Sequence, residues 1–275
     1  MTVLGAGRDP STLEAVVLSL DEMQFLVEKL EIEVPVVLDA RPRYDDSTEH
    51  ARAMDAAAKS LIHRNLLVDQ VLHRDLENRL RVLNRPHWTV ALRLIVDGNV
   101  SRFCLAKGID LSVVALRGQD SYVIDETDTD LPGPILAALG HAEPLELYGL
   151  NAPTDQLATI FADTGDAAAT AERLRKVGNP THDAQALASA LVEIHSYAEI
   201  VGVVYGDGTR EVSDNHIAVF NTRAGRFIAT ASMSDDGVKW TSLSSGTTSR
   251  LRTALQELIT SLPERTDFPR NPQLS

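Results

Sequence analysis

Apolar residues recur at intervals of three and four positions in the first 86 residues, which predicts three helices. The first helix follows Ser19 and Glu22, which form the pattern of a capping box, and the second follows Asp46. Pro86 ends the third, since proline cannot continue a helix. The three apolar stripes are Met23, Leu26, Val27 and Leu30; Ala51, Met54, Ala58, Leu61 and Ile62; and Leu72, Leu76, Leu80 and Leu83.

The apolar period changes to two after Pro86, which predicts strands. Trp88, Val90, Leu92, Leu94 and Val96 alternate with other residues up to Asp97-Gly98, a pair typical of a hairpin turn. Three more strands and a short helix are expected at residues 100–106, 111–117, 121–126 and 135–139. Residues 14–20 and 34–39, on either side of the first helix, are also expected to be extended.

The second half repeats this order of elements. Helices are predicted at residues 154–161, 166–177 and 182–195, and strands at 199–205, 216–220, 226–232 and 239–243. A final helix opens at Gly246-Thr247 and has an apolar stripe made of Leu251, Leu255, Leu258 and Leu262. Consecutive strands with helices grouped apart predict an α+β fold with a largely antiparallel sheet.

The repeated order predicts two pseudo-equivalent halves within one domain that spans residues 1–275. Their limits are about 15–150 and 151–263, with a joint at 150–153. Residues 264–275 are expected to form a loose, polar tail.

Charge and composition narrow the classes of function. The chain of 275 residues carries 26 Lys and Arg against 39 Asp and Glu, a net charge of −13. This balance disfavours non-specific binding to nucleic acid and to anionic membrane surfaces, because both need cationic groups. No signal peptide and no membrane-spanning run is recognised. With a single cysteine, Cys104, no intramolecular disulfide can form, and a cytoplasmic location is expected.

The sequence contains no motif with the spacing and context that catalysis, metal binding or cofactor binding requires. His50, His63 and His73 lack the spacing of a helical zinc site and are expected to be solvated. Cys104 lies in an apolar strand and is expected to be an inert core residue. Gly5-Ala6-Gly7 has no strand before it, as a dinucleotide loop would require. We therefore expect no cofactor, no metal and no enzymatic activity.

The helix around residues 184–194 is apolar on nearly every side. Its apolar residues are Ala184, Ala186, Leu187, Ala188, Ala190, Leu191, Val192 and Ile194. Such a helix is either buried on all sides or has one side available for a partner. The sequence leaves both interpretations open. His195 would close this helix and place a cation at its C-terminus.

Several segments, in order from about Ala15 to Pro263, resemble the EspG family of type VII (ESX) secretion chaperones. The similar segments are VVLSLDEMQFLVEKL, VPVVLDARPRY, LNRPHWTV, VSRFCLAKGIDLSVVALRGQDSYVI, HIAVFNTRAGRFIA and SSGTTSRLRTALQELITSLP. Each segment has low specificity, and their common order carries the resemblance. Ser245-Gly246 departs from the Pro-Gly of many members.

This resemblance implies a quasi-two-fold α+β fold, with a central sheet between N-terminal and C-terminal helical bundles. It also implies a cytosolic chaperone that binds the helical tip of a PPE protein in a PE–PPE heterodimer, and keeps the pair soluble for export. The client surface of the family involves the sheet and the C-terminal bundle. Carried onto this chain, the candidate partner-binding residues are Asp97, Gly98, Asn99, Val100, Leu187, Leu191, Ile194, Ile200 and Val203.

Two alternatives stay open. An EspG-like scaffold without a PE–PPE client would share the fold, and an unrelated α+β enzyme acting on a small molecule would need a cleft with converging titratable groups. A monomer or weak dimer is expected in any of these cases.

Overall fold

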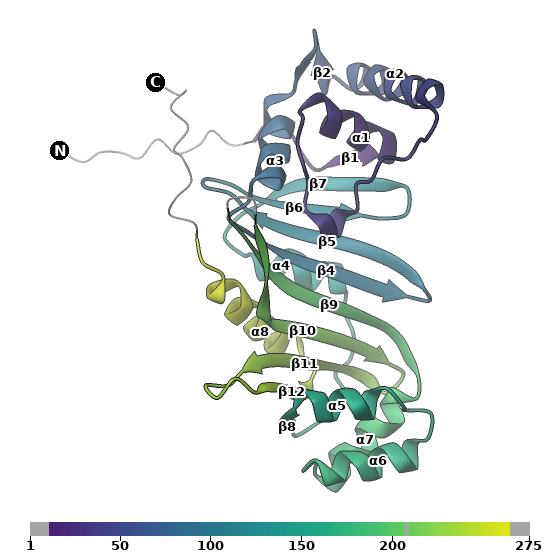
Figure 1. Ribbon diagram of the computed structural model, residues 1–275, viewed down its shortest axis with the longest axis vertical. Coiled ribbons are helices and arrows are strands. Elements are labelled where there is room, and N and C mark those ends of the chain that lie inside the picture. Colours follow the sequence, from purple (N-terminus) through teal and green to yellow (C-terminus); the bar gives the residue numbers. More distant parts are fainter. Residues whose placement is uncertain (1–10, 207–208, 265–275) are drawn as a thin grey trace, which may run out of the picture. The chain divides into compact units, whose positions relative to one another are not determined.

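The computed structural model describes residues 11–206 and 209–264. These residues form two compact units (Figure 1). Unit 1 contains the described residues up to Pro86 together with Arg102–Thr129, and unit 2 contains His87–Ser101 and the described residues from Asp130 onward. This division differs from the predicted repeats 15–150 and 151–263, which stay a prediction.

Unit 1 joins an antiparallel sheet to a group of helices. Its strands lie in the order β1-β7-β6-β5, and α1 packs against α2 while α3 packs against β6 and β7. The elements are β1 Val16–Ser19, α1 Leu20–Lys29, a 3₁₀ turn η1 Val36–Leu38, α2 Ser47–His63, β2 Leu67–Val68, β3 Val71–Leu72, α3 Arg74–Asn84, β5 Asn99–Lys107, which begins in unit 2, β6 Ser112–Arg117 and β7 Ser121–Thr127.

Unit 2 has a larger antiparallel sheet. Its strands lie in the order β4-β9-β10-β11-β12-β8. The elements are β4 Trp88–Val96, α4 Pro132–Leu139, β8 Leu150–Pro153, α5 Thr154–Phe161, α6 Ala167–Lys176, α7 Thr181–Leu191, β9 Ile194–Tyr205, β10 Arg210–Thr222, β11 Gly225–Met233, β12 Lys239–Ser245 and α8 Thr248–Ser261. Helix α5 packs on β12 and on α6, α6 packs on α7, and α8 packs on α4 and β10.

The predicted α+β class and antiparallel pairing are confirmed. The order strand, helices, four strands, helix occurs twice along the chain. In each case the strand before the helices pairs with the last of the four strands, β1 with β7 and β8 with β12. Whether the two halves are equivalent in three dimensions stays a prediction.

Local signals placed most helix ends correctly. Ser19 Oγ accepts the amide of Glu22 at 3.0 Å and the Glu22 carboxylate accepts the amide of Ser19 at 2.8 Å, which completes the capping box. The side chains of Asp46 and Thr247 cap α2 and α8 by accepting backbone amides of the first helical turn. The final stripe is buried as predicted at Leu251, Leu255, Leu258 and Leu262.

Other local predictions were wrong. Val36–Leu38 forms a 3₁₀ turn within the expected extended segment 34–39, because Pro35 occupies the cap position that precedes a helical turn. Ile62 is 49% exposed and does not belong to the buried stripe of α2, in which Ala57 and Leu61 are buried. Leu72 lies in β3 and not in the third helix. Residues 150–153 form the edge strand β8, and their place as the joint between two halves stays a prediction.

Arg79 is the largest fully buried side chain of unit 1 and was not singled out by its sequence pattern. It extends from α3 to β7, where its Nε donates to Glu126 Oε1 at 3.2 Å. Its Nη atoms donate to the carbonyls of Leu13, Glu14 and Ile124 and to Ser11 Oγ. The guanidinium therefore fixes the segment before β1 against the sheet of this unit.

Candidate partner-binding surface

One face of the unit 2 sheet is covered near β4 and β9 by α8 and the residue that follows it. A Cβ placed on Gly202 of β9 would lie 2.5 Å from the side chain of Leu262, which follows α8. Side chains alternate along a strand, so Ile200 points to the same side. Leu92, Ile200 and Ile217 are aligned across three strands and are all buried.

The opposite face is partly exposed along β9 and the second half of β4, whereas Thr89 and Ala91 on the same face are buried. Arg93 and Glu199 are aligned there, form an ion pair at 3.4 Å, and have side chains 55% and 51% exposed. Tyr197 lies beside them and is 38% exposed. We call this surface the open sheet face, defined by Arg93, Ile95, Tyr197, Glu199, Val201 and Val203.

Helices α5–α7 cover this face only farther along the sheet. Phe227 of β11 is buried in the core that these helices form, and Phe220 of β10 stacks on it with ring centroids 4.7 Å apart. Phe161 of α5 meets Phe220 edge-on. The helical layer thus packs over β10–β12, and β4 and β9 keep partly exposed apolar and aromatic residues.

The hairpin after β4 borders the open sheet face. Asp97 and Gly98 have φ angles of 49° and 78°, as the predicted tight turn requires. Asp97, Gly98 and Asn99 are exposed, and Val100 is partly buried. Val96, at the base of the turn, is 41% exposed and pairs with Ser196 near the start of β9. The hairpin therefore leaves the sheet at the end where β9 begins.

The three predicted positions in and after α7 have different environments. Leu187 and Leu191 are 1% and 4% exposed and belong to the core of unit 2, whereas Gln185 on the other side of α7 is exposed, so the helix is buried on one side and not all round. Ile194 is not helical, because α7 ends at Leu191 and Ile194 begins β9. Strand β9 pairs with both β4 and β10, and this pairing satisfies the hydrogen-bonding groups of its backbone. His195 therefore caps no helix.

The remaining predicted positions divide between the two faces of β9. Ile200 is completely buried beneath α8, whereas Val203 lies on the open sheet face. The structure thus brings the hairpin residues, Ile194 and Val203 to accessible positions on one sheet. Sequence reasoning missed Arg93, Tyr197 and Glu199. The signal for them was the presence of polar residues within otherwise apolar strands.

Charge on the open sheet face is balanced. The guanidinium of Arg93 faces the carboxylate of Glu199. His216 is aligned with Val201, and its pKa is lowered, first by burial and then by the nearby charge of Lys239. His216 is consequently neutral at pH 7. The face therefore presents apolar and aromatic area around one ion pair.

The residues considered as candidates for catalysis or metal binding have surroundings that indicate structural roles. Cys104 is fully buried and burial raises the pKa of its thiol, which makes it a poor nucleophile. His73 Nδ1 accepts the amide of Asp75 at 3.3 Å and caps α3. Within residues 11–206 and 209–264, no three His, Cys, Asp or Glu residues group closely enough to hold a metal ion. No helix in the same ranges is long and apolar enough to span a membrane.

Comparison with known proteins identifies relatives over nearly the whole chain. The sequence model of the EspG family matches residues 19–257. The ESX-3 secretion-associated protein EspG3 of Mycobacterium tuberculosis is 25% identical over 94% of this chain and 95% of its own length. The ESX-1 secretion-associated protein EspG1 of Mycolicibacterium smegmatis is 29% identical over 62% of this chain and 58% of its own.

A solved structure shares the fold. The type VII secretion system chaperone EspG5 of Mycobacterium tuberculosis, in complex with the PE25–PPE41 dimer, has a TM-score of 0.76 with this chain. The alignment covers 90% of this chain and 97% of EspG5, with 16% sequence identity.

Proposed function

Since this chain belongs to the EspG family, we propose that it is a cytoplasmic chaperone of a type VII secretion system that binds a PE–PPE heterodimer through the helical tip of the PPE protein. The observation that carries the proposal is the shared fold, over 90% of the chain, with EspG5 in complex with a PE–PPE dimer. By covering an apolar helical tip, such a chaperone keeps its client from self-association. Binding only the native client also stabilises it by mass action.

The open sheet face and the adjoining hairpin are the proposed contact surface. Protein interfaces combine a desolvated aromatic or apolar centre with a polar rim. Tyr197, Ile95 and Val203 supply the centre, and the hairpin residues Asp97, Gly98 and Asn99 supply part of the rim. The buried residues Leu187, Leu191 and Ile200 support this surface from within rather than contact the client.

Tyr197→Ala tests this assignment. Aromatic residues in the centre of an interface contribute much of its affinity, so we expect the Kd for a PE–PPE pair to rise by about tenfold or more. Co-expression with pairs from the same genome, followed by size-exclusion chromatography, identifies the client, and calorimetry then gives the Kd. Tyr44→Ala, which removes a partly exposed tyrosine of unit 1, is the matched control and should leave the Kd unchanged.

The comparison is valid only if the melting curves of both variants match that of the unchanged protein. Equal affinity of the Tyr197→Ala variant would remove the open sheet face from the interface. If no PE–PPE pair co-purifies with the unchanged chain, the chaperone proposal itself fails and the scaffold role becomes the better description.

The affinity for the client should depend only weakly on salt. Burial of apolar area is little screened by ions, whereas charge-driven association weakens as the Debye length falls from about 10 Å at 0.1 M toward 3 Å at 1 M. We expect the Kd to change less than about tenfold between 0.05 and 0.5 M NaCl. A steeper rise would indicate recognition through the acidic surface of this chain, with its net charge of −13.

A further inference from the structure

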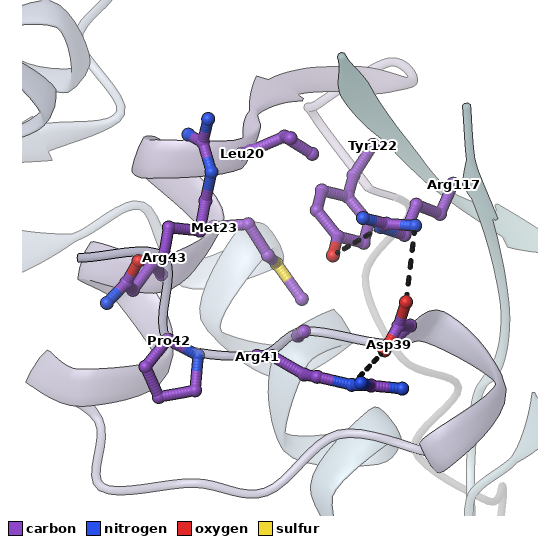
Figure 2. A pocket seen from close by; sticks show the side chains of 10 residues that line it. Leu20, Met23, Asp39, Arg41, Pro42, Arg43, Arg117 and Tyr122 are labelled. Atoms are coloured by element: carbon purple, nitrogen blue, oxygen red, sulfur yellow. Dashed lines mark hydrogen bonds and ion pairs between the residues drawn. The ribbon is translucent and has the colours of Figure 1, made fainter. Parts of the chain in front are cut away.

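Unit 1 contains a small pocket whose wall is rich in arginine (Figure 2). Its volume is about 190 Å³, and it lies between α1, the segment that follows η1, and the strands β6 and β7. We call it the arginine pocket, defined by Leu20, Met23, Asp39, Arg41, Arg43, Arg117 and Tyr122.

Positive charge exceeds negative charge at this pocket. The Asp39 carboxylate is shared by three guanidiniums, at 2.5 Å from Arg41, 3.2 Å from Arg102 and 3.6 Å from Arg117. Arg43 pairs with Asp21. Four guanidiniums therefore surround two carboxylates, which leaves two positive charges in a chain whose net charge is −13. Arg41 keeps 83% of its side chain exposed, so its remaining donors can reach a ligand.

The pocket is also pre-organised. Arg117 Nε donates to the hydroxyl of Tyr122 at 3.1 Å (Figure 2). That hydroxyl donates to the carbonyl of Leu38 at 3.1 Å. Asp39 has a φ of 50°, a left-handed backbone conformation that a non-glycine residue rarely adopts. Such conformations are concentrated at binding sites. Arg117 and Asp39 are thus held in place before any ligand arrives.

The other side of the pocket is apolar, because Leu20 and Met23 of α1 line it. The pocket therefore offers cations for an anion beside apolar area for a hydrophobic group.

We infer that the arginine pocket binds a carboxylate that carries an adjoining apolar group, the chemistry of an acylated amino acid or of the last residue of a peptide. Arginine forms strong charge-assisted hydrogen bonds with carboxylates. The volume of about 190 Å³ equals roughly six water molecules at about 30 Å³ each and fits one residue. It is too small for the cofactors and ligands that occupy pockets of about 300–1,000 Å³.

Calorimetry with defined probes tests this inference on the whole chain. N-acetyl-L-leucine has both groups, N-acetyl-L-leucinamide lacks the charge, and acetate lacks the apolar group. We expect N-acetyl-L-leucine to bind at least about tenfold more tightly than either other probe. Arg41→Gln and Arg43→Gln should each weaken its binding by about tenfold, and the control Arg81→Gln, an exposed arginine of α3, should not.

A peptide ending in leucine, with a free carboxylate, separates the two sources of the ligand. Binding at least about tenfold tighter than that of N-acetyl-L-leucine assigns the pocket to a protein C-terminus, and equal binding assigns it to a free acylated amino acid. Equal affinity for the amide probe, equal affinity for acetate, or unchanged affinity in both arginine variants would overturn the inference. These measurements need no PE–PPE protein, so their result does not depend on the proposed chaperone function.

Discussion

Replacing Arg79 with methionine should destabilise unit 1 by about 3–5 kcal/mol, because removing one partner of a buried charge network strands the others. The guanidinium is 1% exposed and is bonded to Glu126 and to the carbonyls of Leu13, Glu14 and Ile124. Methionine fills similar space but has no hydrogen-bond donor, so in the folded variant these carbonyls are left without the partner that Arg79 supplies.

Arg81→Met is the matched control two residues away. Arg81 forms an exposed pair with Glu77 within α3, and its side chain is 58% exposed. Losing such a pair costs under about 0.5 kcal/mol. Urea denaturation followed by circular dichroism measures both variants. Equal midpoints for the two would contradict the role given to Arg79.

Leu191→Arg should also cost about 4 kcal/mol or more, since it buries a guanidinium without a partner. Leu191 is 4% exposed and lies in the core formed by α5–α7 and the sheet of unit 2. We expect a large fall in melting temperature or no folded protein. Loss of client binding in this variant would then report loss of the fold and not of a contact.

Val192→Arg is the control at the neighbouring position. Val192 is 52% exposed, so a charged side chain there reaches water and should cost under about 0.5 kcal/mol. Thermal unfolding of the pair distinguishes a buried helix from a partner-facing one. A Leu191→Arg variant with an unchanged melting temperature would contradict the burial of α7.

The strands and helices with local signals could be predicted from the sequence. Trp88–Val96 has the predicted limits because alternation and the Asp97-Gly98 turn both specify them. The end of α7 could not be predicted, because the helical spacing of the polar residues Gln185, Ser189 and Glu193 continues past Leu191, where the helix ends. Pairing of Ile194 with Thr222, a residue 28 positions later, decides that β9 begins there.

The candidate surfaces depend on contacts that no local pattern contains. Ile200, Val201, Val203 and Val204 are all apolar, so alternation does not indicate which side of β9 is covered. The contact of Gly202 with Leu262 decides it. The arginine pocket likewise assembles Asp39, Arg102 and Arg117 from separate segments, and none of these residues belongs to a recognisable motif.

The passage of β4 into unit 2 has a consequence for dissecting this chain. Strand β4 pairs along its whole length with β9, yet it precedes most of unit 2 by more than thirty residues. A fragment beginning at Asp130 would lack β4 and leave the long edge of β9 without a partner. Unpaired edges of this kind promote aggregation. Expressing the C-terminal portion in soluble form should therefore require β4 to be supplied, either fused ahead of it or as a separate peptide.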